Sequence, residues 1–143
     1  MKQWVCGVGM ALAAAGCTNG GTTLPASATP APAPTPVATT ETFTGTVSVA
    51  GNDVHPFTVT AANGNLSVTL TAAGPPSTIF MGLGVGAYSG TTCTLISTGT
   101  ITTQAGSAAQ LSGTISAGSY CVMVFDVGNQ SAPVTYTAVV THY

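Results

Sequence analysis

The chain of 143 residues has a single basic residue, Lys2, and three acidic residues, Glu41, Asp53 and Asp126. So few cations leave almost no means of gripping phosphate, which argues against binding to nucleic acid or to anionic lipid surfaces. The 26 threonines supply uncharged polarity instead, and threonine favours pleated strands, so the composition predicts an extracytoplasmic β-protein and not a helical cytosolic one.

The N-terminus has the pattern of a secretory signal. Lys2 precedes an apolar run from Trp4 to Ala13, which is too short to span a bilayer as a mature helix. The run ends in Ala14-Ala15-Gly16-Cys17, which resembles the lipobox of bacterial lipoproteins, although that family prefers Leu where Ala14 stands. The resemblance implies that residues 1–16 are removed and that the Cys17 sulfur carries a diacylglycerol with fatty acyl chains such as palmitate.

Two further expectations depend on this site. In lipoproteins of this kind, Asp after the lipidated cysteine favours the inner membrane, so Thr18 implies the outer membrane, facing the periplasm or the cell surface. The alternative is an ordinary signal peptide cut at Ala13-Ala14-Ala15, which leaves Cys17 unmodified. With Lys2 removed, the mature chain keeps three acids and no Lys or Arg, a formal net charge of −3.

Residues 17–40 read as a lipidated N-terminus and a flexible linker. Pro30, Pro32, Pro34 and Pro36 alternate with small residues, and such a segment prefers extended polyproline II because it cannot bury enough apolar surface to fold. At ~3 Å per residue it would hold a domain several tens of ångströms from a membrane. Glycosylation of its threonines is the alternative to a plain spacer.

Residues 41–143 show the period-two alternation of half-buried strands. Alternating apolar and hydroxyl residues predict strands at 42–49, 57–61 and 66–72, and Asn63-Gly64 predicts a hairpin that joins the second strand to the third. In the next strand, 78–88, Gly82, Gly84 and Gly86 share one face, which predicts the close approach of another backbone or a bulky partner.

The remaining strands are shorter or more apolar. Short strands are predicted at 93–96, 98–103 and 110–115, a central strand that is apolar on both faces at 119–127, and a last strand at 134–140. No stretch after residue 40 has helical periodicity with caps. About eight strands at this spacing predict an all-β fold, a single β-sandwich of jelly-roll type.

The run from Gly118 to Asp126, with the segments 57–59 and 66–70, resembles the bacterial pre-peptidase C-terminal domain family. Members are small β-sandwiches appended to secreted enzymes, and the resemblance covers most of residues 43–142. It implies the sandwich fold. No peptidase precedes the domain in this chain, so it does not carry over a role as an enzyme appendage.

Two cysteines remain once Cys6 is removed and Cys17 is lipidated. Cys93 and Cys121 fall in or beside predicted strands, and an exported compartment permits disulfides, so a Cys93–Cys121 bridge is predicted, with two buried free thiols as the alternative. No His or third Cys lies at metal-ligand spacing, so neither a metal nor another cofactor is predicted.

Candidates for catalysis are scarce, and no catalytic residue is predicted. Asp53-Val54-His55 is expected at a turn before a strand, where the two polar side chains have room to pair, although a turn-forming role is favoured. The run Asp126-Val127-Gly128-Asn129 offers oxygen ligands to calcium, but calcium usually takes several carboxylates, so a turn is again favoured.

The sequence therefore predicts a non-enzymatic membrane-anchored lipoprotein that presents a β-sandwich for extracytoplasmic binding or structural support, with a protein or a glycan as its ligand. A carbohydrate-binding module is the alternative. Its aromatic platform would be Tyr88 or Tyr143, whereas Tyr120 and Tyr136 are interpreted as structural. A concave groove lined by tyrosine would favour sugar, and a flat threonine-covered surface would favour a structural or protein-contacting role.

Overall fold

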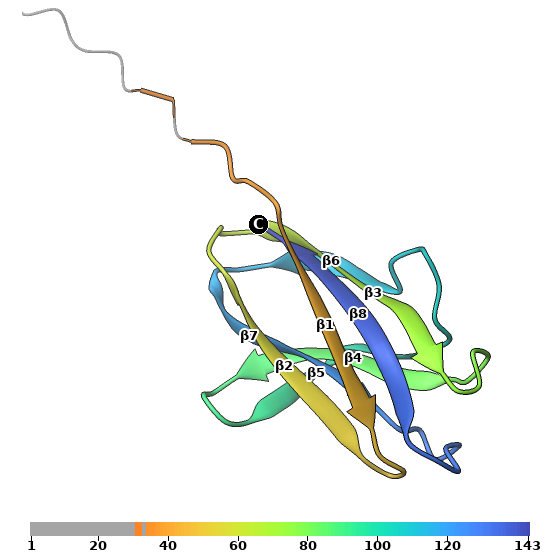
Figure 1. Cartoon of the computed structure of the whole chain (residues 1–143). Helices are drawn as coiled ribbons and strands as arrows, with labels where there is room; N and C mark the ends of the chain where they lie inside the picture. The colour runs from red at the N-terminus through yellow and green to blue at the C-terminus, as the bar shows by residue number, and fades with distance from the viewer. Residues whose placement is uncertain (1–30, 33) are drawn as a thin grey trace, which may run out of the picture. The chain divides into compact units, whose positions relative to one another are not determined.

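The computed structural model describes residues 31–32 and 34–143 and places eight β-strands in them (Figure 1). The predicted signal peptide and the lipidation site Cys17 lie outside the described residues. Within the described part of the chain, no helix is long and apolar enough to cross a membrane. The strands are β1 (Thr39–Val47), β2 (Asn52–Val59), β3 (Gly64–Gly74), β4 (Met81–Tyr88), β5 (Cys93–Thr103), β6 (Leu111–Ile115), β7 (Gly118–Phe125) and β8 (Val134–His142).

The strands form two antiparallel four-stranded sheets, with the orders β1-β8-β3-β6 and β2-β7-β4-β5. The first strand pairs with the last, the second with the seventh, the third with the sixth and the fourth with the fifth. These nested pairs alternate between the two sheets, which is the arrangement of a jelly roll. The predicted all-β jelly-roll sandwich is confirmed.

The core lies between the sheets, where β3, β4, β7 and β8 supply most of the buried apolar residues. Leu70 and Val140 of the first sheet and Met81, Leu83 and Val124 of the second are almost fully buried. The strand β7 lies between β2 and β4, as predicted from its apolar residues on both faces. Burying one such side chain stabilises the fold by roughly 1.5–3 kcal/mol.

The predicted hairpin at Asn63-Gly64 is wrong. Strand β2 belongs to one sheet and β3 to the other, so the turn at Asn63, which has φ 57°, carries the chain across the sandwich. Local sequence cannot distinguish the two cases, because a left-handed Asn before Gly suits a tight hairpin and a crossing turn equally.

Most strand ends differ from the prediction by a few residues, and two of the differences bear on the candidate site or on the sheet pairing. Residues 93–103 form one strand, β5, in place of two, and its pairing with β4 shifts register between Gly84 and Gly86. Strand β2 begins at Asn52, so Asp53 and His55 lie within a strand and not at the predicted turn before it. Pro56 does not end the strand, because β2 is an edge strand and can accommodate a residue without an N–H.

The close approach predicted over the glycine face of β4 is confirmed. A Cβ at Gly82 would overlap the Phe125 ring, and one at Gly86 would overlap the backbone carbonyl of Thr94. Because the backbone of β5 lies so near Gly86, Cys93 reaches Cys121 on β7, and the predicted disulfide is present, with 5.8 Å between the two Cα atoms. Cys121 is fully buried.

Candidate functional site

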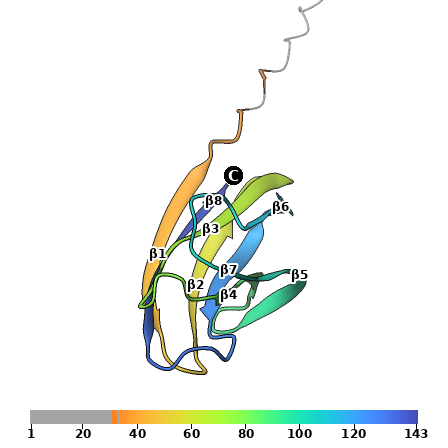
Figure 2. The ribbon, with the colours of Figure 1, turned by 90° about the vertical axis from the view of Figure 1, so that its right-hand side faces the viewer.

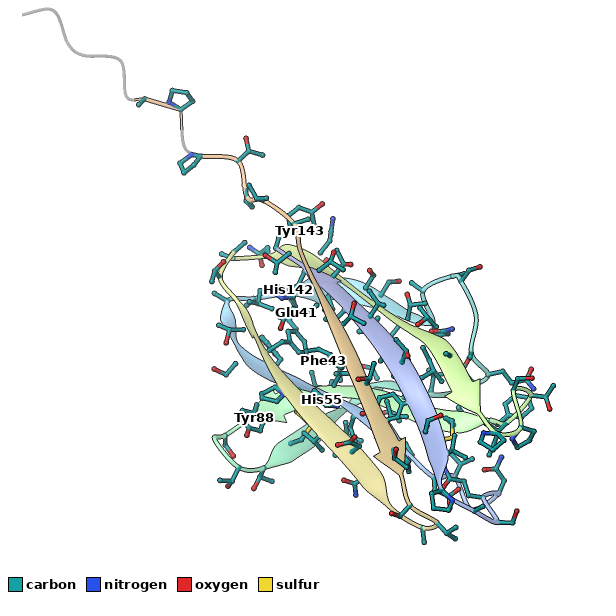
Figure 3. The ribbon with its side chains drawn as sticks, viewed as in Figure 1. Glu41, Phe43, His55, Tyr88, His142 and Tyr143 are labelled. Carbon is teal, nitrogen blue, oxygen red and sulfur yellow. A yellow bond between two sulfur atoms is a disulfide. The ribbon has the colours of Figure 1, made fainter. Side chains whose placement is uncertain are left out.

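Ionisable side chains gather along the edge of the sandwich where β1 of one sheet faces β2 of the other (Figure 3). Four of the five acidic and histidine side chains of the described domain lie there, the exception being Asp126. We call this row the polar seam. It consists of Glu41 and Phe43 on β1, Asp53 and His55 on β2, and Tyr136 and His142 on β8.

The centre of the polar seam is a chain of hydrogen bonds through Tyr136. Its hydroxyl donates to Asp53 Oδ2 at 2.9 Å and lies 2.8 Å from His55 Nε2. Burial, followed by the bond to the Asp53 carboxylate, raises the pKa of Tyr136 well above its ordinary value, so the hydroxyl keeps its proton. Since that proton is given to Asp53, the hydroxyl accepts from His55 Nε2–H.

Gly45 on β1 makes room for this arrangement. A Cβ at this position would overlap the Asp53 carboxylate and would lie 2.9 Å from the Tyr136 hydroxyl oxygen. Next to it, the Phe43 ring stacks on the His55 ring with 4.8 Å between centroids and an interplanar angle of 15°. An aromatic contact therefore joins β1 to β2, and hydrogen bonds beside it join β2 to β8.

A second pair closes the same edge nearer to the chain's C-terminal end. His142 Nε2 lies 2.9 Å from Glu41 Oε1, and the His142 ring packs against Phe57 with 5.4 Å between centroids. The His142 side chain is only 5% exposed, whereas that of Glu41 is 34% exposed. His142 Nδ1 is buried and has no hydrogen-bond partner among the described residues.

These groups contact one another and not a nucleophile. Within residues 34–143, no Ser, Thr or Cys side chain forms a hydrogen bond with His55 or His142. The pairing of Asp53 with His55 that the sequence allowed occurs mainly through Tyr136, since the direct separation is 3.6 Å. Acyl transfer needs a nucleophile beside its base, which this geometry does not supply. The geometry instead fits a structural role at the sandwich edge.

Asp126 takes the turn-forming role favoured from the sequence. Its Oδ1 accepts the backbone N–H groups of Gly128, Asn129 and Gln130 at 2.8, 3.1 and 3.3 Å, and its Oδ2 accepts that of Ala50 at 2.7 Å. These bonds, led by the one from Ala50, hold the pKa of Asp126 below its ordinary value. The described residues contain no group of three or more His, Cys, Asp or Glu side chains placed to hold a metal ion.

The outer face of the first sheet is covered by threonine. On β1 the exposed threonines alternate with the residues of the polar seam. On β8 and β3, Thr135 and Thr71 are exposed and the other threonines are half-buried. A broad, shallow depression of about 710 Å³ crosses this face. Its hydroxyl lining comes from Thr44, Thr46, Thr135 and Thr137.

Among the aromatic residues that the structure describes, the most exposed is one that the sequence reasoning passed over. Tyr136 is buried and the Tyr120 ring packs on Phe57, which confirms their structural interpretation, and Tyr88 and Tyr143 are only partly exposed. Phe80, in the loop after Gly74-Pro75-Pro76, is 48% exposed. An exposed aromatic ring is therefore present besides Tyr88 and Tyr143, the two platform candidates from the sequence. The one signal was the position of Phe80 after a Pro-rich turn.

No family model matches the chain, and no curated protein matches it. Among solved structures, the chain is similar to PliG of Aeromonas hydrophila, a periplasmic inhibitor of g-type lysozyme. The two share 15% sequence identity over 74% of this chain and 88% of that one, with a TM-score of 0.44. A likeness this distant carries no functional assignment for this chain.

Proposed function

We propose that the chain is a non-enzymatic lipoprotein, anchored in the outer membrane through Cys17, whose β-sandwich binds or supports a macromolecule outside the cytoplasm. One observation carries the proposal: the groups able to do chemistry are turned toward one another in the polar seam. What the domain presents outward is threonine hydroxyls and loops whose one charged residue, Asp126, is bound by backbone N–H groups.

The position of the strand ends supports presentation on a tether. Strand β1 begins at Thr39 at the end of the sandwich where the chain also ends, at Tyr143 (Figure 1). The loops β1–β2, β3–β4 and β7–β8 lie at the opposite end (Figure 1). A tether that enters at Thr39 is therefore attached at the end of the sandwich opposite these loops.

The threonine face favours a structural or protein-contacting role on this surface. A depression this shallow does not enclose a small molecule, and small-molecule sites usually bury most of their ligand. The proposed mature chain has three acids and no Lys or Arg, so we expect recognition to rest mainly on hydrogen bonds and apolar contacts. We therefore expect the affinity of the domain for its partner to change little between low and moderate salt.

Acylation of the full-length chain tests the anchor. In a bacterial host fed labelled palmitate, the wild-type chain should take up label and fractionate with outer membranes, whereas Cys17→Ser should lose the label and become soluble. Cys6→Ser is the matched control, because Cys6 lies in the segment that is removed, and it should behave as wild type. Membrane retention of Cys17→Ser, or a mature N-terminus other than Cys17, would contradict the proposal.

A further inference from the structure

A hollow lies between the β3–β4 and β7–β8 loops, at the end of the sandwich away from Thr39. Its volume is about 270 Å³, and apolar and polar groups share its lining. The β3–β4 loop contributes two prolines and the exposed residue Phe80, and the β7–β8 loop contributes Asn129 and Ser131. The lining includes Pro75, Pro76, Thr78, Phe80, Asn129 and Ser131.

Hydrogen bonds hold the two loops in place. Asn129 Nδ2 donates to the backbone carbonyl of Phe80 at 3.1 Å, which joins one loop to the other. The Asp126 carboxylate fixes the backbone of Asn129 at 3.1 Å, and the Gln104 amide donates to the Thr78 carbonyl. Because the loops are already held in place, a ligand that binds here loses little free energy to loop ordering. This favours a measurable affinity even at a small site.

The lining combines an aromatic ring with neutral hydrogen-bonding groups. Asn129 Oδ1 and the hydroxyls of Thr78 and Ser131 accept or donate no hydrogen bond within the described part of the chain, and all three residues are exposed. No charged side chain lines the hollow. An aromatic face packs well against apolar C–H groups, and neutral amides and hydroxyls suit hydroxyl groups, whereas an anionic ligand would find no cation.

We propose that this hollow binds one residue of a neutral oligosaccharide, with the C–H face of the sugar on the Phe80 ring and its hydroxyls on Asn129 and Ser131. The proposal rests on the binding role proposed above and names its ligand class, but it does not depend on the lipid anchor. It also moves the sugar platform from Tyr88 or Tyr143, at other places in the fold, to Phe80.

The test uses the full mature protein in a detergent that contains no sugar. Its binding is screened on an array of neutral oligosaccharides (glucans, mannans, galactans and chitooligosaccharides), and the strongest binder is then titrated by calorimetry. Phe80→Ala should weaken binding at least tenfold and Asn129→Ala by a smaller factor, while Phe80→Tyr should retain binding because it keeps the ring.

Two controls separate the site from the fold. Val49→Ala removes an equally exposed apolar side chain, 49% exposed, from the β1–β2 loop at the same end and should leave binding unchanged. Tyr143→Ala tests the competing platform and should also leave it unchanged. The proposal is overturned if wild type binds no neutral glycan at millimolar concentration, if Phe80→Ala binds like wild type, or if Tyr143→Ala alone abolishes binding. None of these outcomes affects the acylation of Cys17.

Discussion

The two long edges of the sandwich, where an edge strand of one sheet faces an edge strand of the other, differ in the side chains that line them. At the edge where β1 faces β2, the polar seam joins the sheets through the Tyr136 phenol on β8, which is hydrogen-bonded to the Asp53 carboxylate and the His55 imidazole on β2. Between β5 and β6, at the other margin of the sheets (Figure 2), the opening holds a groove of about 200 Å³ without any charged side chain. Its apolar lining comes from Leu66, Val85, Ile96, Leu111 and Ile115.

The difference shows where a chain with few charges places them. Half-buried polar groups are costly unless each finds a partner, but once paired they fix one arrangement of the strands. The β5–β6 edge has no such pairs. It is restrained by the Cys93–Cys121 disulfide, and the free edge of β5 is interrupted by its irregular pairing near Gly84, an interruption that discourages strand addition from another chain.

Removal of the disulfide should have the largest effect, and it should act on the β5–β6 side. Closing a loop with a sequence separation of 28 residues stabilises a fold by roughly 3–4 kcal/mol in the chain-entropy model. Cys93→Ser with Cys121→Ser should therefore lower the Tm by more than about 10 °C in a calorimetric scan. Amide exchange should rise first in β5 and β6. An equal rise in β1 and β2 would mean that the edges are not independent.

Substitution of Gly45 tests the packing of the polar seam. Gly45→Ala forces a methyl group into the Asp53 carboxylate, and overpacking of this kind costs about 1–3 kcal/mol. Gly113→Ala is the matched control on β6, because a Cβ there meets no atom within 4 Å, and it should change the free energy of unfolding by less than about 0.5 kcal/mol. If urea titrations showed that both variants lose the same free energy of unfolding, the proposed contrast between the edges would be wrong.

Tyr136→Phe isolates the hydrogen bonds of the seam from its packing. The variant keeps the ring but leaves Asp53 and His55 without the hydroxyl between them, and the expected loss of stability is about 1–2 kcal/mol. Tyr120→Phe is the control, since its hydroxyl donates only to the exposed carbonyl of Ser116 at 3.1 Å. The urea midpoint should fall clearly for the first variant and little for the second.

The smallest effect concerns Asp126, the one acid outside the seam. Because its pKa is lower in the folded chain than in the unfolded one, its stabilising contribution is complete above the unfolded pKa and is lost as the pH falls through the folded pKa. Stability should thus decline on acidification, and Asp126→Asn should reduce the slope of that decline. An unchanged slope would show that the hydrogen bonds of Asp126 do not govern the loss of stability in acid.

Much of the fold could be predicted because strand periodicity is a local property. The alternation in Phe43–Val47 and Val134–Val140 identified both the strands and their buried faces. The polar seam could not be predicted, because it depends on β8 lying beside β1, which no local signal near Tyr136 reveals. The prediction of a hairpin at Asn63-Gly64 was wrong for the same reason, because the sequence of a turn does not show which sheet the next strand joins. The lipobox and the resemblance to pre-peptidase C-terminal domains remain predictions.

The nested strand order has a consequence for how the domain acquires its structure. The hydrogen bond between Thr40 and Thr141 joins residues 101 positions apart, because the first strand of the domain, β1, pairs with the last, β8. Folds with such distant contacts form slowly, because the cost of closing a long loop precedes any gain from pairing. Under the proposed export, the emerging chain would lack the partner of β1 until β8 had crossed the membrane. The topology would then keep the polypeptide unfolded, and hence competent for translocation, until its synthesis and passage are nearly complete.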